Sequence, residues 1–293
     1  MTTENEQKIP GQFIPLHYHF NMLRDMERMQ GFKAALQQVV RPGSKVLELG
    51  GGTGVLSFFA AQHTDHVRYV ELNPELVEAA KRILPLNPNG DKVEIIHADA
   101  SEYLPPEPVD VVICEMMHVG LLREKQAEII HGFKQRYLEK FGGPLPVFVP
   151  EACIQAMQAV QQDYHYEGYH APIFEFQDPT AQQPKTEPLS EPIMFQMFAY
   201  DGDIPQTCSY DGQVSIITDG KLNALRFITK NVLAIALDTQ STIDWFNQYL
   251  VVPLHEVLEV KAGDQVAIRF DYPVGADFDA LSDSLHVSVV GKN

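Results

Sequence analysis

The sequence is short of cysteine, of basic residues and of long apolar stretches. Its 293 residues include three cysteines, which lie far apart and form no Cys-x-x-Cys pair. This argues against a disulfide framework and against a cysteine-built zinc site, and it favours a reducing compartment. No apolar run approaches the roughly 20 residues that span a bilayer, and the polar start MTTENEQKIPGQ predicts no signal peptide. We therefore expect a cytoplasmic protein with no membrane partner.

The deficit of basic residues gives the chain a strongly acidic balance. Lys and Arg total 22 against 39 for Asp and Glu, so the formal net charge at pH 7 is −17. Such a surface repels the phosphates of nucleic acids, and no basic stripe interleaved with aromatic residues offsets this. We expect no nucleic-acid partner and an attraction for cations, although solubility alone also explains an acidic surface.

Strands and helices alternate in the first half of the sequence. Short apolar segments are predicted as strands and amphipathic segments as helices, which implies βαβ units and a parallel sheet. Asn73 followed by Pro74 predicts the start of one helix, since Asn caps helices and proline suits the first turn. The predicted strands are residues 45–49, 66–72, 92–99, 109–116 and 146–151, and the predicted helices are residues 20–40, 54–62, 74–84 and 121–140.

The pattern changes near Pro150. Short β-type segments at close spacing, with turn residues between them, predict an antiparallel all-β region, either a barrel or a sandwich. We therefore expect an α/β domain over residues 1–149 and a β-barrel-like domain over residues 150–293. Within the second domain, residues 163–190 are aromatic and then polar and proline-rich, which predicts a projecting arm or loop.

A glycine-rich loop, ELGGGTG, joins the first predicted strand to the following helix. Gly50, Gly52 and Gly54 have the spacing Gly-x-Gly-x-Gly, which permits a tight turn and lets backbone amides approach a ligand at a helix N-terminus. A dinucleotide fingerprint needs a glycine at position 55, where Val55 stands. A nicotinamide oxidoreductase is therefore the weaker alternative.

Acidic residues follow the two neighbouring strands. Glu71 ends the second strand, where a doubly wound sheet meets the ribose hydroxyls of a bound nucleoside. Asp99 follows the third strand and is placed for an adenine amino group. Together with the glycine loop, these residues resemble the class I S-adenosylmethionine-dependent methyltransferases. The resemblance implies that S-adenosylmethionine is the cofactor and that Glu48 faces the amino end of its methionine.

The segment CEMMHVGLLRE follows the fourth strand and carries Glu115 and Glu124 in the spacing Glu-x8-Glu. It resembles the double-glutamate loop of protein arginine methyltransferases, where two carboxylates hold the substrate guanidinium, and we call residues 115–124 by that name. A guanidinium stays protonated up to a pH above ~12 and is a poor nucleophile. Two fixed carboxylates would draw its charge toward the nitrogens that do not react. The alternative is that Glu115 caps the loop and Glu124 is a solvated helix residue.

The predicted N-terminal helix supports the same resemblance. Its sequence matches the family pattern H-x2-M-L-x-D-x2-R at all five positions, with His19, Met22, Leu23, Asp25 and Arg28. In that family the helix is a lid over the cofactor, and its arginine pairs with the cofactor carboxylate. The resemblance therefore implies that Arg28 binds the cofactor and that Met22 and Asp25 face the active site.

Near the C-terminus, the segment STIDWFNQYLVVP resembles the Thr-His-Trp loop of the family. Trp245 takes the tryptophan position, but Asp244 stands where the family has a histidine that pairs with the equivalent of Asp25. We take Asp244 and Trp245 as candidate catalytic residues. Opposed carboxylates of Asp25 and Asp244 would repel each other unless one is protonated or a cation lies between them.

The acceptor side departs from the family in two further places. Phe13 stands where the family has a tyrosine. Within the double-glutamate loop, Met116-Met117-His118-Val119 stands where the family has Trp-Met-Gly-Tyr, so that only Met117 is kept. His118 in the same loop is a candidate pocket residue or general base, for which an amine or hydroxyl acceptor is better suited than a guanidinium. Histidines elsewhere show no tight ligand pattern, so we expect no metal site.

The sequence therefore predicts an N-methyltransferase that uses S-adenosylmethionine and holds a cationic nitrogen, such as a guanidinium, at the double-glutamate loop. The departures around the acceptor favour a small-molecule N- or O-methyltransferase on the same scaffold as the alternative. A cofactor-binding protein without activity is disfavoured by the intact set of Glu115, Glu124, Asp25 and Arg28. The resemblance also implies a head-to-tail homodimer through residues 163–190, for which a surface loop is the alternative.

Overall fold

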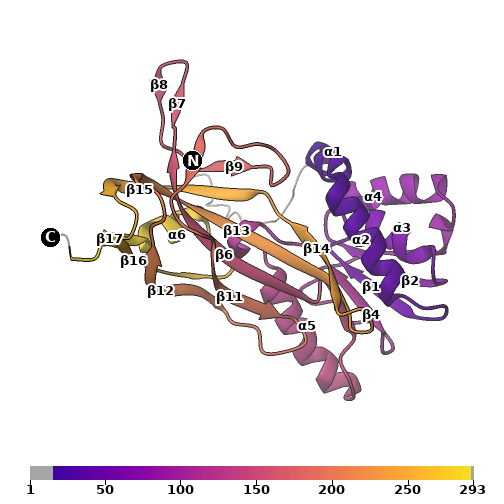
Figure 1. The fold of residues 1–293 in the computed structure, drawn as a ribbon. Coiled ribbons are helices and arrows are strands. Elements are labelled where there is room, and N and C mark those ends of the chain that lie inside the picture. Colours follow the sequence, from indigo (N-terminus) through magenta and orange to yellow (C-terminus); the bar gives the residue numbers. More distant parts are fainter. Residues whose placement is uncertain (1–15, 292–293) are drawn as a thin grey trace, which may run out of the picture.

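The computed structural model describes residues 16–291 and contains a parallel sheet beside an antiparallel β region (Figure 1). Phe13 lies outside the described residues. The parallel sheet has the strand order β3-β2-β1-β4-β5, so the order reverses between β1 and β4. In such sheets ligands bind at the carboxyl ends of the strands at this reversal. Its strands are β1 (Lys45–Leu49), β2 (His66–Glu71), β3 (Val93–His97), β4 (Val111–Cys114) and β5 (Val147–Val149).

Both faces of the parallel sheet are covered. All four residues of β4 are buried, and in β1 only Lys45 is partly exposed, as is typical of parallel strands between helices. Three helices pack in one apolar cluster against β1 and β2, and a fourth packs in the cluster that continues into the antiparallel region. The first three are α2 (Met26–Val39), α3 (Val55–Ala61) and α4 (Pro74–Ile83), and the fourth is α5 (Gln126–Phe141). The predicted alternation of strands and helices is confirmed.

A break at Asp25 divides the helix predicted over residues 20–40. Helix α1 (Leu16–Arg24) ends there and α2 begins at Met26. The Asp25 side chain accepts a 2.9 Å hydrogen bond from the backbone N–H of Arg28, which caps α2 because the first N–H groups of a helix have no helical partner. The unbroken helix was wrong, since side-chain periodicity does not show that this carboxylate competes for the backbone. Helix α4 does begin with the Asn73 cap and Pro74, as predicted.

Antiparallel strands make up the C-terminal half. One sheet has the order β10-β6-β13-β15-β9, with β11 paired to β6 and β14 to β13, and another has the order β12-β16-β17. The predicted fold class, α/β followed by an antiparallel all-β region, is confirmed. The bounds are β6 (Ala152–Gln162), β9 (Glu175–Gln177), β10 (Thr186–Pro188), β11 (Ile193–Ala199), β12 (Thr207–Ser215), β13 (Gly220–Ala236), β14 (Ser241–Phe246), β15 (Tyr249–Val260), β16 (Gln265–Pro273), α6 (Phe278–Ser284) and β17 (His286–Val289).

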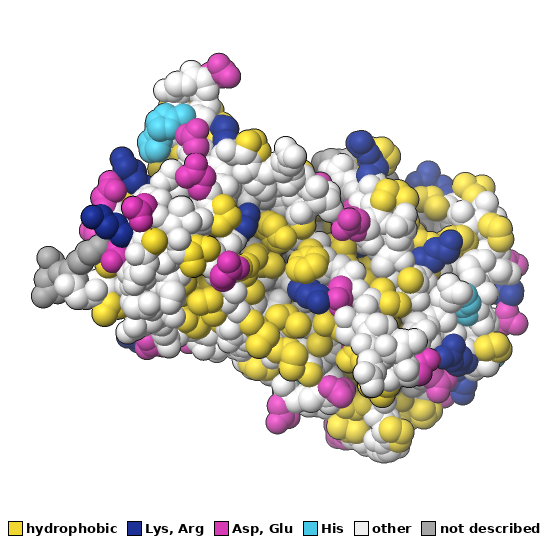
Figure 2. All heavy atoms as spheres, in the orientation of Figure 1, with side chains coloured by type: hydrophobic (Ala, Val, Ile, Leu, Met, Phe, Trp, Pro, Cys, Tyr) yellow, Lys and Arg dark blue, Asp and Glu magenta, His cyan; other side chains and the backbone are white. Residues whose placement is uncertain are grey.

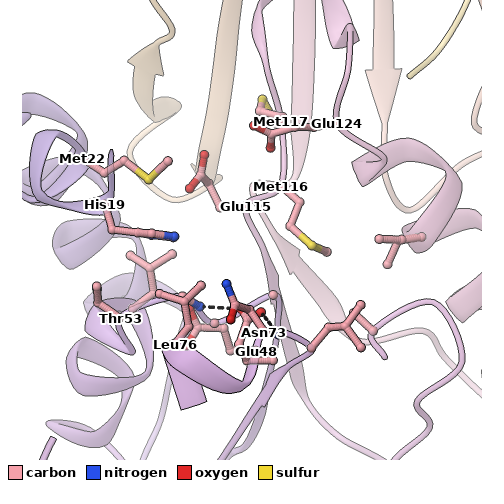
Figure 3. A pocket seen from close by; sticks show the side chains of 18 of the residues that line it. His19, Met22, Glu48, Thr53, Asn73, Leu76, Glu115, Met116, Met117 and Glu124 are labelled. Carbon is pink, nitrogen blue, oxygen red and sulfur yellow. Dashed lines mark hydrogen bonds between the residues drawn. The ribbon is translucent and has the colours of Figure 1, made fainter. Parts of the chain in front are cut away.

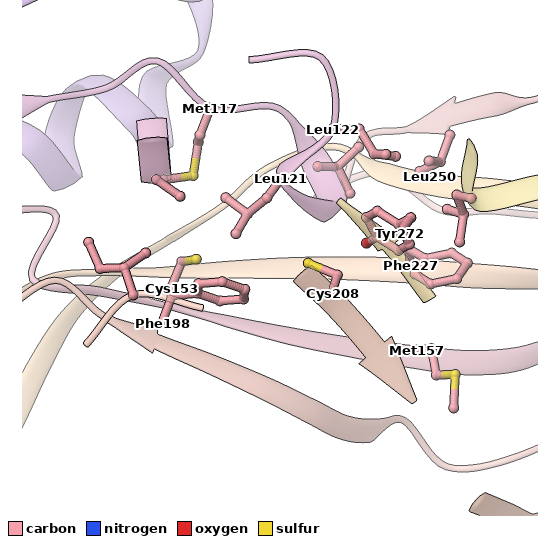
Figure 4. Packing of buried hydrophobic residues seen from close by; sticks show 14 of the residues in the cluster. Met117, Leu121, Leu122, Cys153, Met157, Phe198, Cys208, Phe227, Leu250 and Tyr272 are labelled. Atoms are coloured by element: carbon pink, nitrogen blue, oxygen red, sulfur yellow. The ribbon is translucent and has the colours of Figure 1, made fainter. Parts of the chain in front are cut away.

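One buried cluster joins the parallel sheet to the antiparallel region (Figure 4). Leu121 and Leu122 of the double-glutamate loop belong to it, together with Phe227 of β13 and Tyr272 of β16. All four side chains are at most 2% exposed. The loop that follows β4 is therefore packed into the core along its middle and is not a free surface loop.

Residues 163–190 contain short strands and no helix. A hairpin of β7 (His165–Tyr166) and β8 (Tyr169–His170) projects from the molecule (Figure 1). After it, β9 pairs with β15 and β10 pairs with β6. The segment holds four prolines, which interrupt a helix because they lack the backbone N–H and clash with the preceding turn.

Charge is mixed over the face of the molecule that Figure 2 shows. Hydrophobic side chains gather across its middle, and acidic and basic side chains lie around them. The acidic excess therefore forms no continuous charged surface on this face. Among residues 16–291, no helix combines the length and the hydropathy that a membrane crossing requires.

Candidate active site

Two adjoining cavities lie at the carboxyl ends of the parallel strands. The first has a volume of about 320 Å³ and extends over the glycine loop to Glu71 and Asp99. The second has a volume of about 650 Å³ and extends toward residues 176–180 and 245–248. The side chains that line both are Met22, Arg28, Glu115, Met117 and Glu124.

The glycine loop forms the floor of the first cavity. Gly50 and Gly52 have φ angles of +73° and +55°, which glycine adopts without steric cost. A Cβ atom would lie 2.3 Å from the Met116 sulfur if built on Gly50, and 3.0 Å from the His19 ring if built on Gly52. Figure 3 shows His19 on one side of Glu115 and Met116 on the other. Gly54, with φ of +83°, precedes α3 and does not line the cavity.

Glu48 lies in the wall of the first cavity at the end of β1. It is 2% exposed and accepts hydrogen bonds from the Ser57 hydroxyl and, at 2.9 Å, from the Ser57 backbone N–H. Burial raises the pKa of Glu48 to about 8, although the bonds from Ser57 act in the opposite direction. A cationic group beside it would favour the ionised form.

The two acidic residues at the ends of β2 and β3 also reach the first cavity. Glu71 accepts hydrogen bonds from the backbone N–H groups of Gly52 at 3.0 Å and Asn73 at 2.7 Å. Asp99 accepts from the backbone and hydroxyl of Ser101, at 2.8 and 2.7 Å. Both carboxylates are thus held in one orientation by the backbone that follows their strands.

Glu115 and Glu124 have different environments although they share both cavities. Arg28 and Glu115 form a close ion pair in which the two side chains are 7% and 11% exposed. Burial first, and then the Glu115 charge, raise the pKa of Glu124 to about 8, while Arg28 acts in the opposite direction. The Nη1 group of Arg28 is buried and has no hydrogen-bond partner among the described residues. Glu115 is therefore paired with a cation, whereas Glu124, with a pKa raised to about 8, holds a proton near neutral pH.

Trp245, and not Asp244, contacts Asp25. The indole N–H of Trp245 donates to the Asp25 carboxylate at 3.2 Å. Asp244 forms an ion pair with Lys230 at 2.7 Å and lines neither cavity. Neighbouring residues of a strand point to opposite faces, so on β14 only one of the two can face α2. The predicted opposition of Asp25 and Asp244 was therefore wrong.

His118 lies in the wall of the second cavity only. Its ring is 5.3 Å from the rings of both Phe176 and Phe278, measured between centroids. Burial lowers the pKa of His118, so the imidazole is neutral at pH 7. Its Nδ1 atom is buried without a hydrogen-bond partner in the described part of the chain.

Residues of β9, of β14 and of the segments that follow these strands complete the second cavity. Phe176 of β9 lines it with Asp178 and Thr180, as do Phe246 at the end of β14 and Asn247 after it. The resemblance to the Thr-His-Trp loop marked the segment of Phe246 and Asn247 but not these two residues, and no sequence signal marked Phe176, Asp178 or Thr180. Within residues 16–291, no three or more His, Cys, Asp and Glu side chains are grouped as a metal site.

Comparison with known proteins finds methyltransferases among the proteins that this chain is similar to. The family described as "Methyltransferase domain" matches residues 46–138. An uncharacterized protein of Methanocaldococcus jannaschii is 27% identical over 268 residues, which is 92% of this chain and 96% of that protein. Protein arginine N-methyltransferase 9 of Homo sapiens is 30% identical over 217 residues, which is 64% of this chain and 25% of that protein.

Solved structures show the same fold. The Trypanosoma brucei PRMT1 enzyme–prozyme heterotetrameric complex with AdoHcy has a chain that superposes with a TM-score of 0.75 at 17% identity, over 94% of each chain. The parallel sheet and the antiparallel region are therefore a Rossmann-like methyltransferase fold followed by a β-rich domain, as the sequence predicted.

Proposed function

We propose that the acceptor of this S-adenosylmethionine-dependent methyltransferase, which resembles the protein arginine methyltransferases, is a cationic nitrogen, most simply a guanidinium. Its cofactor is S-adenosylmethionine. One observation carries the proposal: Glu115 and Glu124 line both cavities, so both carboxylates lie where a cofactor and an acceptor would meet.

The residues of the first cavity fit S-adenosylmethionine. The unpartnered Nη1 group of Arg28 is a buried donor that a carboxylate would satisfy. Glu48 offers a buried carboxyl for the ammonium group, and Glu71 and Asp99 offer acceptors for the ribose hydroxyls and the adenine amino group. When bound, the cofactor supplies an electrophilic methyl group on a sulfonium.

Glu115 and Glu124 would hold and polarise the acceptor. A guanidinium has N–H donors in a fixed planar fork, and carboxylates accept them in pairs. Glu124 would give up its proton to solvent as the cation arrives, because a neighbouring positive charge favours the carboxylate. Charge is then drawn to the bonded nitrogens, and the remaining nitrogen gains the lone-pair character that a nucleophile needs.

Asp25 and Trp245 would act at the lid over the cofactor. Asp25 caps α2 and receives the indole N–H of Trp245, and the cap bond fixes the first turn, which carries Arg28. This pair would therefore position Arg28, which itself contacts Glu115. Asp244 has no such place in the mechanism.

A small free molecule that carries an amine is the second candidate acceptor. The observation that favours it is His118, a neutral side chain whose Nδ1 atom is unpartnered in the wall of the second cavity. A neutral imidazole accepts a proton from an ammonium more readily than from a guanidinium, because the pKa mismatch is smaller. Met22 and Met117 would line the apolar part of either acceptor's site.

Methyl transfer from labelled cofactor tests the proposal. Wild-type protein is incubated with an arginine-rich peptide, with free arginine and with a primary alkylamine. We expect label in a cationic nitrogen acceptor, and we expect Glu115→Gln and Glu124→Gln to lower kcat/KM by about 100-fold or more, as for other groups that stabilise developing charge. The control is Glu139→Gln, an exposed residue of α5 outside both cavities.

Two outcomes would contradict the proposal. One is full turnover by Glu115→Gln and Glu124→Gln in folded protein. The other is label that appears in none of the three cationic nitrogen acceptors but does appear in an alcohol or phenol added in a parallel incubation. Label in free arginine or the amine but not in the peptide would make the small molecule the acceptor.

A further inference from the structure

The backbone of the double-glutamate loop does not fix its own shape. Gly120, Leu121 and Arg123 have positive φ angles of 70°, 52° and 61°, a conformation that surrounding structure must hold in place for the two residues other than glycine. Inside the loop there are few backbone bonds, such as Leu121 N–H to His118 O at 3.0 Å. The separation of Glu115 and Glu124 therefore depends on contacts with other segments.

The middle of the loop is held by the antiparallel region. The backbone N–H of Gly120 donates to the Thr229 hydroxyl on β13, and the Tyr272 hydroxyl on β16 donates to the Gly120 carbonyl, both at 2.8 Å. Leu121 and Leu122 are buried beside them. These contacts hold the centre of the loop. They do not reach its two ends, which carry Glu115 and Glu124.

Gln126 joins the two ends. This first residue of α5 is 1% exposed. Its side-chain oxygen accepts the backbone N–H of Met116 at 2.9 Å, and its own backbone N–H donates to the Met116 carbonyl at 3.2 Å. Met116 directly follows Glu115, and Gln126 comes two residues after Glu124. The bonds therefore connect the backbone beside one glutamate to the backbone beside the other.

The Gln126 amide is itself held in place. Its Nε2 group donates to the Tyr200 hydroxyl at 2.9 Å. Tyr200 is fully buried after β11, and its backbone N–H donates to the Glu151 carbonyl at 2.9 Å. The amide thus has one orientation, with its oxygen toward the loop and its nitrogen toward the antiparallel region, and both ends of the loop are fixed to a rigid sheet.

We propose that Gln126 is the positioning residue that sets the separation of Glu115 and Glu124. Gln126 lines neither cavity, so it acts on the acceptor through the two carboxylates. The inference rests on the proposed function of those carboxylates. Without the amide, the first turn of α5 keeps only the 3.2 Å backbone bond to Met116 at the end of β4, which holds the two segments less firmly, and a misplacement of about 1 Å is enough to cost about 100-fold in rate.

Titration of Glu124 reports this separation without any acceptor. The charged groups that act on Glu124 are Glu115, which raises its pKa, and Arg28, which lowers it. If the two glutamates move apart, the repulsion weakens and water reaches the carboxyl, and both changes lower the pKa of Glu124. A residue that only contributed to folding would leave this titration in place.

The experiment compares Gln126→Leu with Gln158→Leu in the full chain. Gln158 is a matched control, since it is 5% exposed and donates to the Ser190 carbonyl at 2.7 Å, but it has no bond to the loop. For each variant, Glu124 is titrated by NMR of carboxyl-labelled protein, and kcat, KM and cofactor affinity are measured. We expect Gln126→Leu to lower the pKa of Glu124 and to lower acceptor kcat/KM by at least about tenfold, with cofactor affinity within about twofold. Gln158→Leu should change neither the titration nor kcat/KM.

A second variant covers the case in which Gln126→Leu does not fold. Tyr200→Phe keeps the ring and removes only the oxygen that receives the Gln126 amide, and we expect the same changes at smaller size. The proposal is overturned if Glu124 titrates as in the wild type in every folded variant, or if Gln158→Leu gives the same shift. If wild-type protein methylates no cationic nitrogen, the proposed function fails, and the titration still decides the role of Gln126.

Discussion

Proton release from Glu124 should make acceptor binding depend on pH. Burial and the charge of Glu115 raise the pKa of Glu124 to about 8. A guanidinium is charged at every pH below ~12, so over the neutral range the protonation of Glu124 decides whether the acceptor meets a carboxylate or a neutral acid. The perturbation is a change of pH from 6 to 9 at saturating cofactor, because Glu48 in the cofactor cavity has a pKa that is also raised to about 8.

The size of the effect follows from the raised pKa. A group with a pKa of about 8 is ~90% protonated at pH 7, so binding of a cation at that pH releases ~0.9 proton. The cation favours the ionised carboxylate, which means that the pKa of Glu124 falls in the complex and that acid opposes binding. Acceptor affinity should therefore rise about tenfold per pH unit below pH 8 and become constant above it.

Calorimetry and kinetics measure this linkage. Titrations with acceptor at pH 7 in buffers of different ionisation enthalpy give the number of protons released, and kcat/KM from pH 6 to 9 gives the profile. Glu139→Gln should keep the profile, whereas Glu124→Gln should flatten it because the titrating group is gone. A wild-type kcat/KM that is constant between pH 6 and 8, with no proton release, would refute the reasoning.

Three further predictions concern other parts of the molecule. Gly50→Ala should lower cofactor affinity on the order of tenfold by calorimetry, since its Cβ would lie 2.3 Å from the Met116 sulfur; Gly43→Ala, with φ of +85° and open space around it, is the control for backbone strain. Asp244→Asn should leave kcat/KM within about twofold and cost less than about 1 kcal/mol in unfolding free energy, because its lysine pair is partly exposed; a large loss of activity would return Asp244 to the mechanism. The homodimer through residues 163–190 stays a prediction. Analytical ultracentrifugation should give a dimer for the wild type and a monomer for a chain without the β7–β8 hairpin, and a wild type that is itself monomeric would contradict it.

The sequence could predict those parts of the site that depend on one strand end. Glu71, Asp99 and the glycine loop lie at the carboxyl ends of neighbouring parallel strands, and the order of such strands brings their ends to one edge. Their position around one cavity could therefore be predicted from the alternation of strands and helices alone. The start of α4 at Asn73 was predictable for a similar local reason, because a cap and a proline are read within a few residues.

Contacts between distant segments could not be predicted in the same way. The second cavity needs Phe176 and Asn247 to reach the double-glutamate loop, and no spacing in the sequence reports this. The amide of Gln126 gave no signal either, since glutamine within a predicted helical segment is usually exposed to solvent. The face of β14 that turns toward α2 depends on register, and a shift of one residue exchanges Asp244 for Trp245.

The partner of Asp25 is a tryptophan instead of the family histidine, and this affects the pH dependence of the site. In the family that this chain resembles, a histidine pairs with the equivalent of Asp25, and a histidine changes its charge in the range where enzymes work. Here the donor is the indole N–H of Trp245, which does not titrate. The cap of α2, and with it the position of Arg28, should therefore stay constant between pH 6 and 9. It follows that the Trp245 donor adds no titration of its own to the rise of acceptor affinity at saturating cofactor, and that Trp245→His would add one.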